Sequence, residues 1–160
     1  MKTLLLARHA KSDWGAPALA DHDRPLNPRG RENAPAMARR LRDEGVVLDL
    51  IVSSTALRAR STASAYAAAF GLDLAEEPLL YAASAHAILQ IASMLPDESG
   101  TAMLVGHNPG MSDAVHELTG SFVEMPTCAV AECTLDAHSW AELVDGAGSL
   151  VSVRTPRDGG

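Results

Sequence analysis

The sequence is poor in cysteine and aromatic residues. Only two of its 160 residues are cysteines, Cys128 and Cys133, and only 4% are aromatic. The cysteines have neither the CxxC spacing nor the neighbouring histidines of a zinc site. Residues five apart in a strand point to opposite faces, so a disulfide between them is disfavoured. We therefore expect two reduced, packed thiols, which indicates a reducing, cytoplasmic compartment.

The chain also lacks a long apolar run. Its first residues, MKTLLLARHAKSD, carry one lysine, three leucines and then charge. This apolar stretch is too short for a signal peptide or a membrane-spanning helix, and it is typical of an early β-strand. We therefore predict a soluble protein with no membrane partner.

Positive charge is scarce overall but unevenly distributed. The chain has 13 Lys and Arg against 20 Asp and Glu, and its formal net charge is -7. Because nucleic-acid affinity depends on a basic surface, we expect no nucleic-acid partner. Arginines are nevertheless crowded into residues 24–42 and 58–60. This crowding favours a local anion site, although a solvated helix face better explains the arginines at 39–42.

Length and composition indicate one globular unit. Apolar residues make up 47% of the chain and charged residues 21%, which is enough to build one hydrophobic core. We expect a single domain over residues 1–156 and a frayed tail over 157–160. Apolar runs alternate with helical patterns, which is typical of α/β folds. We predict a three-layer α/β/α sandwich whose sheet is mostly parallel, with an antiparallel C-terminal edge and no lid domain.

The elements of this fold are predicted from apolar periodicity and from turn residues. Strands are expected at residues 3–7, 50–52, 72–75, 102–105, 129–135 and 150–153. Three apolar stripes predict helices: one over 57–70 ended by Gly71, one between the cap Ser84 and Pro96, and one over 111–118.

Two helix starts carry a proline. For the helix over 111–118, Asn108 is the expected N-cap and Pro109 the first helical position. Asn27 and Pro28 look like the start of a helix that covers 34–42, but Pro35 predicts a kink or a late start there.

Three predicted strand ends carry side chains that can bind anions. Arg8 and His9 follow the first strand, and His107 follows the strand at 102–105. Arg58 lies in the first turn of the helix after the strand at 50–52. In open parallel sheets, ligands bind beyond the carboxyl ends of the strands. A neutral imidazole can attack phosphorus, and guanidinium groups bind phosphoryl oxygens with forked hydrogen bonds. A packed core histidine or an exposed arginine explains each residue alone, but explains the set of four less well.

These segments resemble the signatures of the histidine phosphatase superfamily, also called the phosphoglycerate mutase-like superfamily. Arg8-His9-Ala10 matches its Arg-His-Gly motif, and Ser54 through Ala63 matches its Ser-x-x-x-Arg-x-x-x-Thr-Ala segment. Gly106-His107 matches its second Gly-His pair. Within the superfamily, the short chain and the segments at 23–26, 80–84 and 106–110 are most similar to the SixA-type phosphohistidine phosphatases.

The resemblance implies roles for particular residues. His9 would be the nucleophile that becomes phosphorylated. Arg8, Arg58 and His107 would complete the catalytic phosphate pocket, with Ser12 as an additional phosphate contact. It implies no metal ion and no cofactor.

The sequence departs from the family at the general acid. Where the mutases carry a glutamate, this chain reads Leu79-Leu80-Tyr81-Ala82. An alkoxide needs a proton to leave, whereas imidazole is a far better leaving group. Asp23 or Asp21 could serve as a modest proton donor, although capping a turn or pairing with Arg24 explains both residues better.

The sequence favours a phosphatase that works through phospho-His9 and removes phosphate from phosphohistidine on a protein, because a short chain leaves few residues for a lid. Two alternatives stay open. One is a phosphatase or mutase-like enzyme for a small phosphorylated substrate. The other is a non-catalytic phosphoprotein-binding module or a phosphocarrier. We expect Trp14 to be a packing residue, although it lies close enough to the first motif to border the pocket. We expect His22 to be a surface or cap residue.

Overall fold

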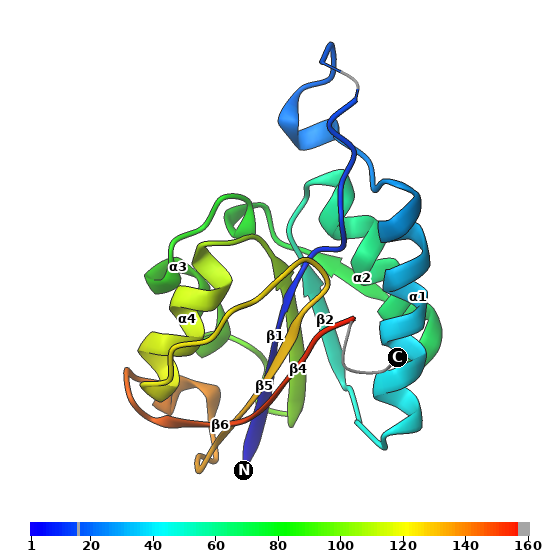
Figure 1. Ribbon diagram of the computed structural model, residues 1–160. Helices are drawn as coiled ribbons and strands as arrows, with labels where there is room; N and C mark the ends of the chain where they lie inside the picture. The colour runs from blue at the N-terminus through cyan, green and yellow to red at the C-terminus, as the bar shows by residue number, and fades with distance from the viewer. Residues whose placement is uncertain (16, 157–160) are drawn as a thin grey trace.

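One six-stranded sheet lies between two layers of helices in the computed structural model, which describes residues 1–15 and 17–156 (Figure 1). The predicted three-layer α/β/α fold is confirmed. The tail expected at 157–160 lies outside the described residues.

All six predicted strands and all four predicted helices are present. The strands are β1 (Lys2–Arg8), β2 (Leu50–Ser53), β3 (Leu74–Glu76), β4 (Thr101–Gly106), β5 (Val130–Leu135) and β6 (Gly148–Arg154). The α-helices are α1 (Pro28–Asp43), α2 (Leu57–Phe70), α3 (Ala85–Ser93) and α4 (Gly110–Thr119). Three short 3-10 helices are η1 (Asp21–Asp23), η2 (Pro78–Leu80) and η3 (Trp140–Glu142).

The order of strands across the sheet is β3-β2-β4-β1-β5-β6. Strands β3, β2, β4 and β1 run parallel, whereas β5 pairs antiparallel with β1 and with β6. The antiparallel C-terminal edge is therefore confirmed. Because β2, β4 and β1 are neighbours and parallel, their carboxyl ends lie side by side at one edge of the sheet.

Helices α1 and α2 cover one face of the sheet, and α3 and α4 cover the other (Figure 1). In β1, Leu5 and Ala7 pack with the α1 and α2 side, while Leu4 and Leu6 pack with the α3 and α4 side. Burial on both faces explains why this strand is an unbroken apolar run in the sequence. Cys128 and Cys133 are free thiols buried in these two cores, as expected.

Several predicted helix ends are confirmed by their capping contacts. Gly71 ends α2 with φ at 66°, a left-handed conformation that glycine adopts without strain. The Ser84 side chain accepts a hydrogen bond from Ala87 N at the start of α3.

The two proline-containing helix starts differ from expectation. Helix α1 begins at Pro28 and continues through Pro35, so a late start was wrong. The buried face of this helix, which includes Met37 and Leu41, outweighs the one backbone hydrogen bond that Pro35 removes. Helix α4 begins at Gly110 with Pro109 as its N-cap, one residue later than expected, and the Asn108-Pro109 peptide bond is cis. The Asn108 side chain still accepts a hydrogen bond from Ser112 N at 3.2 Å in the first turn.

Residues 13–15 and 17–25, here called the η1 loop, rise above the carboxyl ends of the strands (Figure 1). Its base is closed by a hydrogen bond from Asp13 N to Pro25 O at 2.8 Å. Next to that base, Asn27 N donates to Lys11 O at 3.0 Å. Helix α1 packs so tightly here that a Cβ on Gly30 would collide with the same carbonyl oxygen. This closed base fixes how the loop leaves the sheet.

None of the described helices has the length and apolarity needed to cross a membrane.

Candidate active site

His9 lies directly after β1 and is 7% exposed. Its Nδ1 atom lies 2.7 Å from Ala10 O. Because a carbonyl oxygen can only accept, Nδ1 carries the ring proton and Nε2 keeps its lone pair. Burial lowers the pKa of His9 to about 3, and the nearby His107, Arg58 and Arg8 also lower it, against the Ala10 hydrogen bond that raises it. His9 is therefore a neutral imidazole near pH 7 with a free Nε2, as a nucleophile must be.

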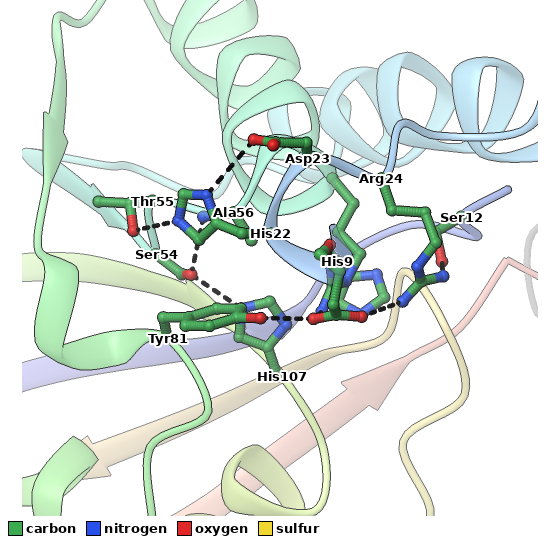
Figure 2. A network of polar contacts seen from close by, with 12 residues as sticks. His9, Ser12, His22, Asp23, Arg24, Ser54, Thr55, Ala56, Tyr81 and His107 are labelled. Atoms are coloured by element: carbon green, nitrogen blue, oxygen red, sulfur yellow. Dashed lines mark hydrogen bonds and ion pairs between the residues drawn. The ribbon is translucent and has the colours of Figure 1, made fainter. Parts of the chain in front are cut away.

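His107 follows β4 and is fixed by Ser54, which follows β2. Ser54 Oγ accepts a hydrogen bond from Ala56 N at 3.2 Å and lies 2.8 Å from His107 Nε2 (Figure 2). The Ser54 oxygen already accepts from Ala56 N, and we assign its hydroxyl proton to the contact with Nε2. The hydroxyl therefore donates to Nε2, and His107 carries its own proton on Nδ1. Burial, followed by Arg58, lowers the pKa of His107 to about 4.

The rings of His9 and His107 have their centroids 5.2 Å apart and are tilted by 53° to each other. Arg8 and Arg58 lie close enough to both histidines to lower their pKa values. Arg8 Nη1 donates to Met125 O at 3.0 Å. The four residues that the sequence singles out thus come together at the carboxyl edge of the sheet.

Thr62 joins the segment that follows β1 to the helix that carries Arg58. Its Oγ1 accepts a hydrogen bond from Ala10 N at 2.9 Å and donates to Arg58 O at 2.8 Å. Arg58 and Thr62 are four residues apart, so they lie on one face of α2, which faces the end of β1. This geometry gives a physical reason for the spacing in the Ser-x-x-x-Arg-x-x-x-Thr segment.

Several buried N–H groups in this region have no acceptor within the described part of the chain. They are Arg8 Nε, Arg24 Nε, Arg58 Nε and His107 Nδ1. A buried donor without a partner is costly, and most such groups in proteins are satisfied. A phosphoryl group carries several acceptor oxygens and negative charge, so it would satisfy donors of this kind.

Asp21, in the η1 loop, is the anion that these cations hold in the free protein. Its Oδ2 accepts from Arg58 Nη2 at 3.0 Å and from the Tyr81 hydroxyl at 2.5 Å, and its Oδ1 accepts from Arg24 Nη2 at 3.0 Å. Arg58 Nη1 also donates to Asp21 O at 2.7 Å. The hydrogen bond from Tyr81, followed by those from Arg24 and Arg58, lowers the pKa of Asp21 far below its usual range.

Neither aspartate is favoured as a proton donor by this arrangement. Asp21 is ionised near neutral pH and has no proton to give. Asp23 points away from the pocket, and its carboxylate has one partner in the part of the chain described, His22 Nδ1 at 3.8 Å (Figure 2).

Sequence reasoning missed three residues of this network, and Figure 2 shows them around the two catalytic candidates His9 and His107. Arg24 is 8% exposed and belongs to the arginine-rich segment that indicated an anion site. Tyr81 packs edge-on against His107 with centroids 5.5 Å apart. His22, expected at the surface, packs edge-on against Tyr81 at 4.9 Å, and its Nε2 lies 2.8 Å from Thr55 Oγ1. No periodicity or motif in the sequence marked His22. Tyr81 lies in the family-like segment at 80–84, but that resemblance indicated no role for it.

The two remaining sequence expectations concern the rim of the pocket. Ser12 is buried, and its Oγ accepts a hydrogen bond from Arg24 Nη1, so it lies next to the cationic cluster. Its role as a phosphate contact stays a prediction. Trp14 is 78% exposed, and Arg24 stacks on its ring with the guanidinium carbon 3.5 Å from the ring centroid. Trp14 therefore borders the site rather than packing in the core, as its exposed ring shows.

Comparisons with known proteins show which family the chain resembles. A family model described as "Histidine phosphatase superfamily (branch 1)" matches residues 4–85. An uncharacterized chloroplastic protein of Arabidopsis thaliana is 34% identical over 152 residues, which cover 88% of this chain and 70% of that protein.

Two solved structures have the same fold. The protein provisionally assigned as the phosphohistidine phosphatase SixA of Nakamurella multipartitia has a TM-score of 0.87 and 27% identity, over 97% of this chain and 96% of that one. The protein with the same provisional assignment from Agrobacterium tumefaciens has a TM-score of 0.82 and 30% identity, over 97% and 98% of the two chains.

Proposed function

This chain belongs to the histidine phosphatase superfamily, and we propose that it is a phosphatase whose substrate is phosphohistidine on another protein. One observation carries the proposal: a neutral, buried imidazole with a free Nε2 lies among arginine and histidine N–H groups that have no acceptor within the described residues. This combination fits attack on a phosphoryl group better than passive binding of one, because binding alone needs no nucleophile.

The proposed reaction has two steps. First, the lone pair on His9 Nε2 forms a bond to phosphorus, and the bond from phosphorus to the leaving group breaks. Arg8, Arg58 and the Nδ1–H of His107 donate to the phosphoryl oxygens and stabilise their charge, so the step needs no metal ion. Second, water attacks phospho-His9 and releases inorganic phosphate and neutral His9.

The chemistry of the leaving group supports phosphohistidine as the substrate. An ester oxygen leaves well only when an acid protonates it, and the nearby Asp21 is held in its ionised form. An imidazole that already carries a proton on its second nitrogen leaves as a neutral molecule and needs no acid. The provisional assignment of two similar structures as SixA phosphohistidine phosphatases supports the same substrate class.

A substrate panel tests this proposal. We would compare kcat/KM for a phosphohistidine-bearing protein, a phosphoserine peptide and a phosphorylated sugar acid, with His9→Ala as the inactive control. The proposal predicts that the phosphohistidine protein is preferred by at least tenfold and that His9→Ala is inactive on all three. A preference for the sugar acid would refute this substrate and favour a small-molecule phosphatase.

A further inference from the structure

We propose that the Asp21 carboxylate recognises the leaving ring of phosphohistidine by accepting a hydrogen bond from the ring nitrogen that does not carry phosphorus. This inference rests on the proposed function and deepens it, because it assigns the residue that distinguishes phosphohistidine from a phosphate ester. Asp21 takes no part in the two-step mechanism described above.

The position of Asp21 beside the phosphoryl site is set by Arg58. The two terminal nitrogens of this guanidinium donate to Asp21, at 2.7 Å to its backbone oxygen and 3.0 Å to Oδ2. The third nitrogen, Nε, is buried and has no acceptor among the residues described. The planar Arg58 guanidinium would therefore bind a phosphoryl oxygen at Nε and the Asp21 carboxylate at a terminal nitrogen. A leaving group attached to that phosphorus would depart close to Asp21.

The carboxylate has room for one more donor. A carboxylate offers about four lone-pair positions to donors. Three are used in the described structure, two on Oδ2 and one on Oδ1, by Arg58, Tyr81 and Arg24. The Asp21 side chain is 50% exposed, whereas those of Arg58 and Arg24 are 7% and 9% exposed. Oδ1 can thus accept a substrate N–H without losing either arginine.

The ionised state of Asp21 suits this role. Phosphohistidine carries phosphorus on one ring nitrogen and, when its ring is protonated, a proton on the other. Attack by His9 Nε2 breaks the bond between phosphorus and the ring, and the bonding electron pair moves to the ring nitrogen. The ring, cationic before the step, leaves as a neutral imidazole that keeps its proton on the second nitrogen. An anionic acceptor at that nitrogen favours the protonated ring, which is the form that leaves as a neutral imidazole.

His9, the attacking imidazole, also has an oxygen acceptor at its second ring nitrogen. Its Nδ1–H donates to Ala10 O, which holds the proton on the ring nitrogen that does not attack. The phosphoryl group would pass between two imidazoles, each with an oxygen acceptor at its second nitrogen. A phosphate ester has no such N–H, and an ionised carboxylate cannot supply the proton that its leaving oxygen needs.

The experiment compares Asp21→Asn with wild type on phosphoimidazole and on p-nitrophenyl phosphate. The variant loses the anionic acceptor while it keeps a side chain of nearly equal size. We expect kcat/KM for phosphoimidazole to fall tenfold to a hundredfold, the range for a hydrogen bond to a charged group. The loss on p-nitrophenyl phosphate should be at least tenfold smaller. Asp23→Asn removes the same charge two residues away as a matched control and should keep the wild-type preference.

Two further arms separate ring recognition from a structural role. Asp21→Glu retains the carboxylate and should restore part of the preference for phosphoimidazole. A phosphoimidazole methylated on the second nitrogen has a cationic ring without an N–H. On this substrate, the ratio of wild-type to Asp21→Asn kcat/KM should be at least fivefold lower than on phosphoimidazole. Equal losses in Asp21→Asn on every substrate, with or without the methyl group, would overturn the inference. If wild type forms no phospho-His9 with any substrate, the proposed function itself fails.

Discussion

The two pocket histidines should make the protein unusually sensitive to acid. His9 and His107 are 7% and 8% exposed, with pKa values lowered to about 3 and about 4, mainly by burial. In the unfolded chain a histidine titrates near a pKa of about 6.5. As the pH falls below that value, the unfolded chain binds protons at these histidines, whereas the folded protein does not. The stability that these groups preserve above about pH 6.5 is therefore lost progressively as the pH falls toward their folded values.

The size of this loss follows from the linkage relation. Each such histidine contributes a slope of about 1.4 kcal/mol per pH unit between its unfolded and folded pKa values. Two histidines over the interval from about pH 6 to 4.5 give a loss of about 4 kcal/mol. The whole stability of a domain is about 5–15 kcal/mol, so this is a large share of it.

Urea unfolding followed by circular dichroism at several pH values between 6 and 4.5 measures this slope directly. His9→Ala and His107→Ala should each flatten the slope by about 1.4 kcal/mol per pH unit. Because the slope is the readout, the cost of the cavity left by each substitution does not enter. The exposed His86 supplies the control, and His86→Ala should keep the wild-type slope. The reasoning is wrong if His9→Ala and His107→Ala lose stability with pH as steeply as wild type.

Three substitutions test the contacts that hold the site. Ser54→Ala removes the hydroxyl that fixes the Nδ1–H form of His107, so kcat should fall about tenfold with KM nearly unchanged, the effect of one hydrogen bond, as steady-state kinetics would show. Thr62→Val leaves Ala10 N buried without an acceptor and should lower the free energy of unfolding by about 1–3 kcal/mol in urea titrations. Arg58→Lys keeps the charge but loses the planar donor set, so the affinity for tungstate, measured by calorimetry, should fall at least tenfold, and equal affinity would contradict the assigned role of Arg58.

The sequence predicted the elements that depend on local pattern. Apolar runs located all six strands, and Gly71 and Ser84 marked helix ends because each makes a short-range contact that its residue type favours. The convergence of His9, His107 and Arg58 followed from one rule of parallel sheets, since all three come after neighbouring strands.

The parts that the sequence did not predict depend on long-range contacts. Asp21 and Tyr81 are 60 residues apart and meet because the η1 loop folds over the strand ends. No local sequence pattern determines where a loop of this kind packs. The start of α4 was misplaced for a related reason, because the chain around Pro109 is shaped by contacts outside the helix, such as the hydrogen bond from Asn108 Nδ2 to Met125 O at 3.0 Å.

The most direct test of the account is rapid-quench trapping of the phosphorylated protein during turnover of a phosphohistidine substrate. The account predicts a covalent phosphoryl group that is labile in acid, stable in base and located on His9, and that forms at least as fast as steady-state turnover. His9→Ala should trap none. Turnover without a phosphorylated intermediate, or a phosphoryl group on another residue, would contradict the assignment of His9 as the nucleophile.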